Sequence, residues 1–176
     1  MMGGMSWPGL WLGGTLALCP VAASVAVAQD GPAEGTHELA RSLLSNMHVG
    51  RMLDDILTAK RGELVEIVRR QSGKDEAQAA VVVDQFIMPE FRVAKPDLLT
   101  RFEDVLVRDF TTDELRSVAY DQDDAARQSA RAKVPQMQAD FTEAGRAWGG
   151  TVGREAFAKN RAALEQLGFD EKAFSK

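Results

Sequence analysis

Histidines, serines and clustered carboxylates are the side chains of this sequence whose types could do chemistry. His37 and His48 are the only histidines, and the one cysteine, Cys19, lies in an apolar N-terminal segment. Two histidines eleven residues apart on one helix are about three turns apart, too far to share a metal ion. No serine stands in a Gly-x-Ser-x-Gly turn, so no nucleophile with a base beside it is visible. We therefore predict no catalytic residue, no metal ligand and no cofactor.

Acidic residues offer two weaker candidates. Asp121, Asp123 and Asp124 resemble the start of a calcium loop, which places oxygen ligands at alternate positions and a glycine at its sharp turn. Alanines follow where further ligands and the glycine would stand, so this run predicts a polar turn. Glu63 and Glu66 could act as paired carboxylates in a hydrolase, but a solvated helix face explains them more simply.

A complete set of sequence signals for a helix N-terminus begins at Phe110. Thr111 is a favoured N-cap, and Glu114 stands three residues later, where a carboxylate completes a capping box. Phe110 and Leu115 flank the cap at the positions of a hydrophobic staple. These signals predict a helix that begins directly after Thr111.

Beyond Pro135, apolar residues recur every three or four positions and so share one face of a helix: Met137, Phe141, Ala144, Trp148 and Val152. Glycines between positions 145 and 153 predict either that this helix ends near Gly149 or that it packs closely on a neighbour. Phe141 and Trp148 are the candidate face for a ligand or partner. Core packing is the simpler interpretation of both.

The remaining chain also follows helical spacing. We expect helices from residue 37 with an interruption at Gly50, a turn over residues 71–73, and a buried helix over 77–91 although Val81–Val83 alone would suit a strand. Pro96 is expected to start a helix with Arg101, Glu103, Asp104 and Arg108 on its outside, and Gly168 to close a last long helix. The predicted fold is all-α, a compact bundle of about six or seven helices in a single domain over residues 37–176.

The N-terminal segment carries the targeting prediction. Residues 1–28 lack charged side chains, and Ala26-Val27-Ala28 has the small-x-small form of a signal-peptidase site. We predict a cleaved signal peptide over 1–28 and a flexible linker over 29–36. The alternative is an uncleaved anchor, because about 20 apolar residues suffice to span a bilayer. Export places the protein in the periplasm or outside a Gram-negative cell, with membrane contact only through this segment.

Composition excludes one class of partner and one kind of stabilisation. The chain carries 21 basic and 26 acidic residues, a net charge of −5, with no basic stripe. This balance argues against nucleic acid as the main partner. Removal of Cys19 with the signal peptide would leave a chain without disulfides, held together by its core.

The stretch from Phe110 onward resembles a bacterial family catalogued as domain of unknown function 2059, whose members are mostly small, secreted and helical. The family pattern runs from Phe-Thr-x-x-Glu-Leu through a Phe-Tyr pair and a later proline to a helix that often carries tryptophan. Ala119 replaces the first aromatic of the pair, and residues 122–125 differ from the family's Ser-Pro-x-Gly turn. The matching residues are Phe110, Thr111, Glu114, Leu115, Tyr120, Pro135 and Trp148. The resemblance implies an exported helical domain with no assigned activity.

Three functional hypotheses follow. The first is a non-enzymatic exported domain that binds another envelope protein or a second copy of itself. The second is a carrier that holds a small apolar ligand between helices near Trp148. The third is a hydrolase built from scattered carboxylates.

Overall fold

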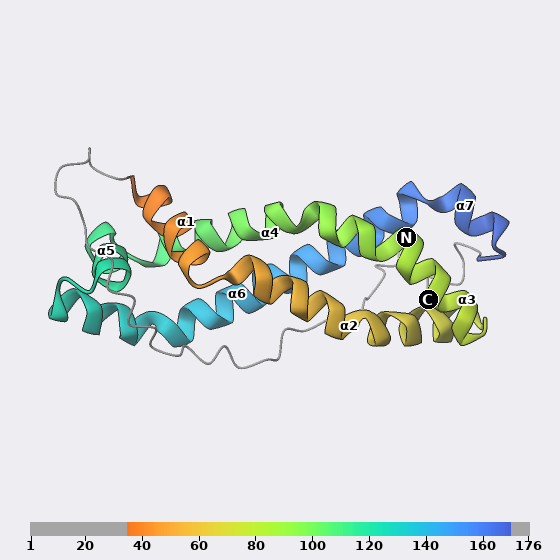
Figure 1. The fold of residues 1–176 in the computed structure, drawn as a ribbon, viewed down its shortest axis with the longest axis horizontal. Coiled ribbons are helices and arrows are strands. Elements are labelled where there is room, and N and C mark those ends of the chain that lie inside the picture. The colour runs from red at the N-terminus through yellow and green to blue at the C-terminus, as the bar shows by residue number, and fades with distance from the viewer. Residues whose placement is uncertain (1–34, 170–176) are drawn as a thin grey trace, which may run out of the picture. The chain divides into compact units, whose positions relative to one another are not determined.

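The computed structural model describes residues 35–169, and within that range every regular element is helical. The prediction of an all-α bundle of about six or seven helices is confirmed. The predicted signal peptide lies outside the described residues, as does the linker apart from Gly35 and Thr36. No helix in the described range is long and apolar enough to cross a membrane. In chain order the elements are α1 (Thr36–Asn46), α2 (Val49–Ser72), α3 (Glu76–Val82), the π-helical turn η1 (Val83–Ile87), α4 (Met88–Asp109), α5 (Thr112–Tyr120), α6 (Asp124–Lys159) and α7 (Arg161–Gln166). Figure 1 labels the α-helices.

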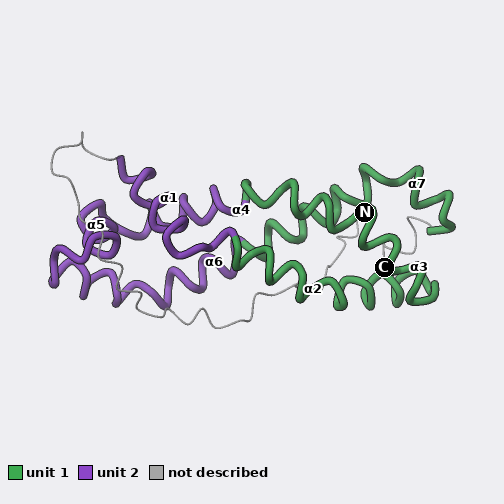
Figure 2. Tube along the Cα trace, in the orientation of Figure 1, with its two compact units in different colours: residues 1–12, 51–97, 145–176 green, residues 13–50, 98–144 purple. Residues whose placement is uncertain are grey.

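The described chain forms two compact units, coloured separately in Figure 2. Unit 1 contains residues 51–97 and 145–169, and unit 2 contains residues 35–50 and 98–144. Both have fully buried apolar side chains, such as Leu64 and Ile87 in unit 1 and Leu39 and Leu98 in unit 2. Apolar burial of this kind is the main driving force for helix packing.

In unit 1, α2 runs antiparallel to the segment formed by α3, η1 and the first half of α4. Asp54, early in α2, accepts from Lys95 Nζ at 2.8 Å. Arg61, further along α2, donates to Asp84 of η1 at 2.7 Å. As residue numbers rise in one helix, those of the partner fall, which is the arrangement that a short turn between two helices produces. That turn covers residues 73–75, so the turn predicted over residues 71–73 begins two residues too early, and Gly73 lies in the left-handed region at φ 67°.

The end of α6 lies antiparallel to α4 in the same unit. The Trp148 indole Nε1 donates to the Ala94 carbonyl at 3.1 Å. Twelve residues later, Asn160 Nδ2 donates to the carbonyl of Phe86, inside η1, at 3.3 Å. A side-chain donor at this point helps to satisfy a backbone group in a turn where the regular hydrogen-bond register changes.

In unit 2, α1 packs against α4 and α5 through polar contacts. The hydroxyls of Thr36 and Thr112 lie 2.7 Å apart. Glu103 of α4 binds His37 Nδ1 at 3.0 Å and Arg41 Nη2 at 3.0 Å. The prediction that Glu103 lies outside is wrong: its side chain is only 9% exposed, because His37 and Arg41 cover it.

The helix boundaries predicted at Gly50 and Pro96 are wrong. The interruption expected at Gly50 lies at Met47 and His48, and His48 takes the left-handed conformation at φ 54° that usually favours glycine. Pro96 lies inside α4, and Pro135 lies inside α6. A proline removes one intrahelical hydrogen bond, and the apolar stripes that continue on both sides keep each helix intact.

The glycine cluster does not end α6, which continues to Lys159. Gly145, Gly149 and Gly153 are buried and recur every four residues, so they share one face. The expected last long helix is instead the end of α6 followed by the short α7. Gly168, at φ 75°, does close α7, and the Phe169 amide donates to the Leu164 carbonyl at 2.9 Å as a Schellman turn requires.

Candidate functional site: the Glu114 cluster

Glu114 is the carboxylate that the predicted capping box places at the start of α5. Its Oε2 accepts from the Thr111 amide at 2.7 Å, and its own amide donates to Thr111 Oγ1 at 3.2 Å. Both bonds of the box are therefore formed, and the prediction is confirmed. Phe110 and Leu115, the predicted staple residues, are both buried.

The same carboxylate also reaches α6. Ser129 Oγ donates to Glu114 Oε1 at 2.6 Å, and Lys133 Nζ donates to Oε2 at 2.6 Å. Ser129 and Lys133 are four residues apart, so one face of α6 presents both. Glu114 thus joins the first turn of α5 to the first half of α6.

The electrostatics of Glu114 follow from these partners. Its side chain is 7% exposed. Burial acts to raise the pKa of Glu114, but hydrogen bonds from Lys133, Ser129 and the Thr111 amide, together with the Lys133 charge, lower that pKa to about 2. The carboxylate is therefore charged at neutral pH.

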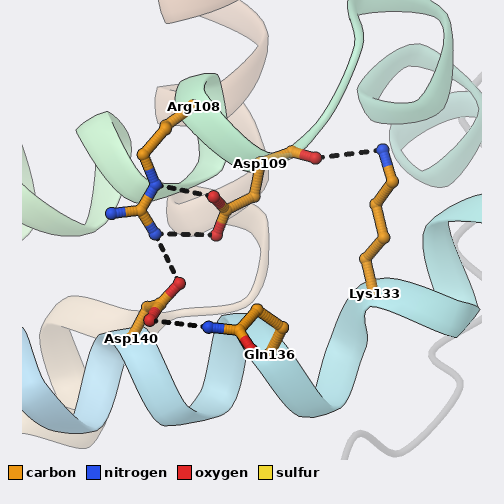
Figure 3. Close-up of polar contacts among 5 residues, drawn as sticks. All are labelled: Arg108, Asp109, Lys133, Gln136 and Asp140. Atoms are coloured by element: carbon orange, nitrogen blue, oxygen red, sulfur yellow. Dashed lines mark hydrogen bonds and ion pairs between the residues drawn. The ribbon is translucent and has the colours of Figure 1, made fainter.

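Lys133 has further contacts at the end of α4. Its Nζ donates to the backbone carbonyl of Asp109 at 3.0 Å, a bond drawn in Figure 3. It also lies 5.6 Å from the centroid of the Phe110 ring, within the range of a cation–π contact. One ammonium group therefore connects α6 to α5, to the last residue of α4 and to the residue that precedes the cap.

A second polar group lies beside this cluster, between α4 and α6 (Figure 3). Arg108 donates to both oxygens of Asp109, at 2.7 and 3.0 Å, and also binds Asp140 of α6. Gln136 donates to the other Asp140 oxygen at 3.0 Å. The hydrogen bond from Arg108 lowers the pKa of Asp109 below its ordinary value. Both carboxylates of this group, Asp109 and Asp140, are therefore paired within it.

The chemistry available to the Glu114 cluster is limited by its own pairing. A general base works best with a pKa near the ambient pH, far above the value of Glu114. The Ser129 hydroxyl donates to this carboxylate, and the Lys133 ammonium is bound to it as well. The geometry is that of a structural connection among three helices.

Phe141 and Trp148 are buried in separate units. Phe141, in unit 2, stacks on Phe102 with ring centroids 4.2 Å apart. Trp148, in unit 1, meets Phe91 edge to face at 5.2 Å and donates its indole N–H to Ala94. The structure thus places each predicted face residue in the core of its own unit.

Other residues singled out from the sequence have structural surroundings. Tyr120 is the partly exposed last residue of α5, and Pro135 is exposed within α6. Asp121 and Asp124 pair with Arg127. Over the range 35–169, no group of three potential ligands is placed to hold a metal ion.

Sequence reasoning missed Ser129 and Lys133 as partners of Glu114. They lie 15 and 19 residues further along the chain. Their spacing of four residues shows a shared helix face, but nothing in that spacing identifies the carboxylate that they bind. Only the packing of α5 on α6 does so.

Comparisons with known proteins leave the chain without an assigned relative: no protein-family model, no curated protein and no solved structure matches it. The resemblance to domain of unknown function 2059 remains a prediction that rests on the residues named for it.

Proposed function

We propose that this protein is a non-enzymatic helical domain that acts by binding another protein of the cell envelope. The observation that carries the proposal is the pairing of Glu114. The most strongly shifted carboxyl of the described chain is occupied by Thr111, Ser129 and Lys133. A carboxylate paired in this way stabilises the fold and does not act as a base. We therefore expect the protein to act through binding at its surface.

The surface offers a place to test this proposal. Val93, in the first half of α4, is 74% exposed. Pro96 is also exposed, and Pro89 is partly exposed. Residues three or four apart share a helix face, so these three side chains lie along one line. An apolar side chain this exposed is a good position from which to report a contacting protein.

The carrier hypothesis has less support from the surroundings of Trp148. Its indole N–H is bonded to the Ala94 carbonyl, and its ring packs against Phe91. A ligand beside the indole would have to displace these contacts, each of which stabilises the folded state.

Site-specific photo-cross-linking in the native cells tests the proposal. A photoreactive amino acid replaces Val93, and a matched control places it at the exposed, charged Asp55 of α2. We expect an adduct with another envelope polypeptide from position 93 and none from position 55. The composition of the adduct is read by mass spectrometry.

Native mass spectrometry of the protein purified from its own cells separates the alternatives. A second polypeptide in the complex supports the proposal. A bound small molecule, with no adduct from position 93, would contradict it and favour the carrier.

A further inference from the structure

The π-helical turn η1, which lies between α3 and α4, changes which residues of α3 face the core. After the turn, Ile87, Met88 and Phe91 are buried. A regular α-helix rotates by about 100° per residue, so continuing this pattern backward would place Asp84 toward the core and Val82 on the opposite side. The structure has the reverse, with Val82 fully buried and the Asp84 side chain 46% exposed.

The hydrogen bonding explains this rotation. The Met88 amide donates to the Val83 carbonyl, five residues earlier rather than four. A turn of this kind holds one extra residue, which rotates everything before it relative to everything after it. The segment α3 is therefore one residue out of phase with α4.

Both phases would bury apolar side chains from α3. The observed phase buries Ala79 and Val82 of α3, together with Val83 at the start of η1. The phase of a continuous α-helix would turn Ala80 and Val81 inward instead, and these are of the same residue types. The largest difference between the two phases is at Asp84, whose charged side chain would move from the surface to the core.

Asp84 has a partner only in the observed phase. Arg61 of α2 donates to both of its oxygens, at 2.7 and 2.6 Å. In the continuous α-helical phase this carboxylate would point into the core of unit 1, away from Arg61. Burial of an unpaired carboxylate is strongly unfavourable, so the charge of Asp84 opposes that phase.

We propose that the Arg61–Asp84 ion pair holds α3 in one of two registers, and that loss of the Asp84 charge lets η1 relax into regular α-helix with Val82 rotated outward. The loss of one charge in η1 would thus rotate the whole of α3. The device is separate from the proposed binding function and stands on the contacts of unit 1 alone.

Thiol labelling reads the register directly. With Cys19 replaced by serine, a cysteine introduced at position 82 is the only one in the chain. It is buried in the observed register, so we expect slow labelling that requires local opening. Combined with Asp84→Leu, Val82→Cys should be labelled faster by about tenfold or more. Val81→Cys, now 40% exposed, should become slower.

Asp54→Leu is the matched control. It also removes an exposed carboxylate of unit 1 from an ion pair, that with Lys95 at 2.8 Å. It lies outside η1, so it should leave the labelling rates of both cysteines unchanged. If Asp84→Leu keeps the circular dichroism of the parent and Val82→Cys remains protected, the proposal is overturned.

A second variant decides the matter if Asp84→Leu unfolds the chain, which rapid labelling of both cysteines and loss of helical circular dichroism would reveal. Deletion of Gln85 removes one residue from η1 and brings α3 into phase with α4 as regular helix. We expect this variant to be folded, with Val82→Cys protected and Val81→Cys labelled. Unfolding, or rapid labelling at position 82, would refute the two-register proposal.

Discussion

Glu114 shows at the residue scale how one side chain can serve two elements. Its carboxylate caps α5 and binds Ser129 and Lys133 of α6, with little of the side chain exposed. Hydrogen bonds to charged groups contribute more to stability than neutral ones, and a buried partner left behind adds a further cost.

Glu114→Gln should therefore lower the free energy of unfolding by about 2 kcal/mol, because Lys133 loses its charged partner. Urea denaturation measures the change. The control is Glu63→Gln, which removes an exposed carboxylate paired with Lys60 three residues away, and which should change stability by less than about 0.5 kcal/mol. Equal effects of the two substitutions would contradict the assignment of Glu114.

The contribution of Glu114 should also depend on pH. Its pKa falls from the ordinary 4.5 to about 2 in the folded protein. A carboxyl with a lowered pKa stabilises the fold above its unfolded pKa and loses that contribution as the pH falls toward the folded value. The stability difference between parent and Glu114→Gln should hold above pH 4.5 and shrink between pH 4.5 and about 2. A difference that is constant across this range would show that the charge contributes nothing.

At the element scale, alanine substitutions at two glycines, one inside α2 and one directly after it, should change the free energy of unfolding in opposite directions. Gly62 lies in the helix with open space around a Cβ, whereas Gly73 follows the helix at φ 67°. Gly62→Ala should raise the free energy of unfolding by about 1 kcal/mol, because alanine loses less backbone entropy. Gly73→Ala should lower it by about 1 kcal/mol, because a Cβ disfavours that conformation. Thermal melting compares the pair, and a shift of the same sign in both would be inconsistent with these backbone assignments.

The sequence predicts a helix boundary well where the boundary depends on local hydrogen bonds, and poorly where it depends on packing. Thr111 and Glu114 lie close together in the chain and form their box locally, so spacing alone identified it. Pro96 is expected to start a helix, yet α4 runs through it, as α6 runs through Pro135. Whether a proline interrupts a helix depends on how much packing lies on both sides of it, and that packing is set by the rest of the fold.

The candidate site shows the same limit over longer separations. The contacts of Glu114 with Ser129 and Lys133 span 15 and 19 residues, and the cover of Glu103 by Arg41 spans 62. From residue type alone, all of these side chains would be expected on the surface. The burial of Glu103 and Glu114, and the pairing of all five residues, arise only when α1, α4, α5 and α6 assemble in unit 2.

At the scale of the whole described chain, residues 35–169 form two units that share two long helices. Residues 88–97 and 98–109 of α4 belong to different units, as do residues 124–144 and 145–159 of α6. Unfolding one unit would leave each shared helix with half of its packing, and long helices depend on packing for their stability.

We therefore expect one cooperative unfolding transition. The fluorescence of Trp148 reports unit 1, and far-ultraviolet circular dichroism reports all helices. With Trp7 and Trp11 replaced by phenylalanine, the two probes should give the same urea midpoint. Separate midpoints would show that the units unfold independently.

The contacts of Lys133 have a consequence for chemical reactivity. Its amine is engaged by the Glu114 carboxylate, the Asp109 carbonyl and the Phe110 ring, whereas the Lys159 amine forms an ion pair with Glu90 on a side chain that is 65% exposed, and an exposed ion pair is easily opened. Acylating reagents need a free amine lone pair, so Lys133 should be modified late and Lys159 early. The ratio of the two acylated peptides would then measure the fraction of folded protein in a crude sample, without purification.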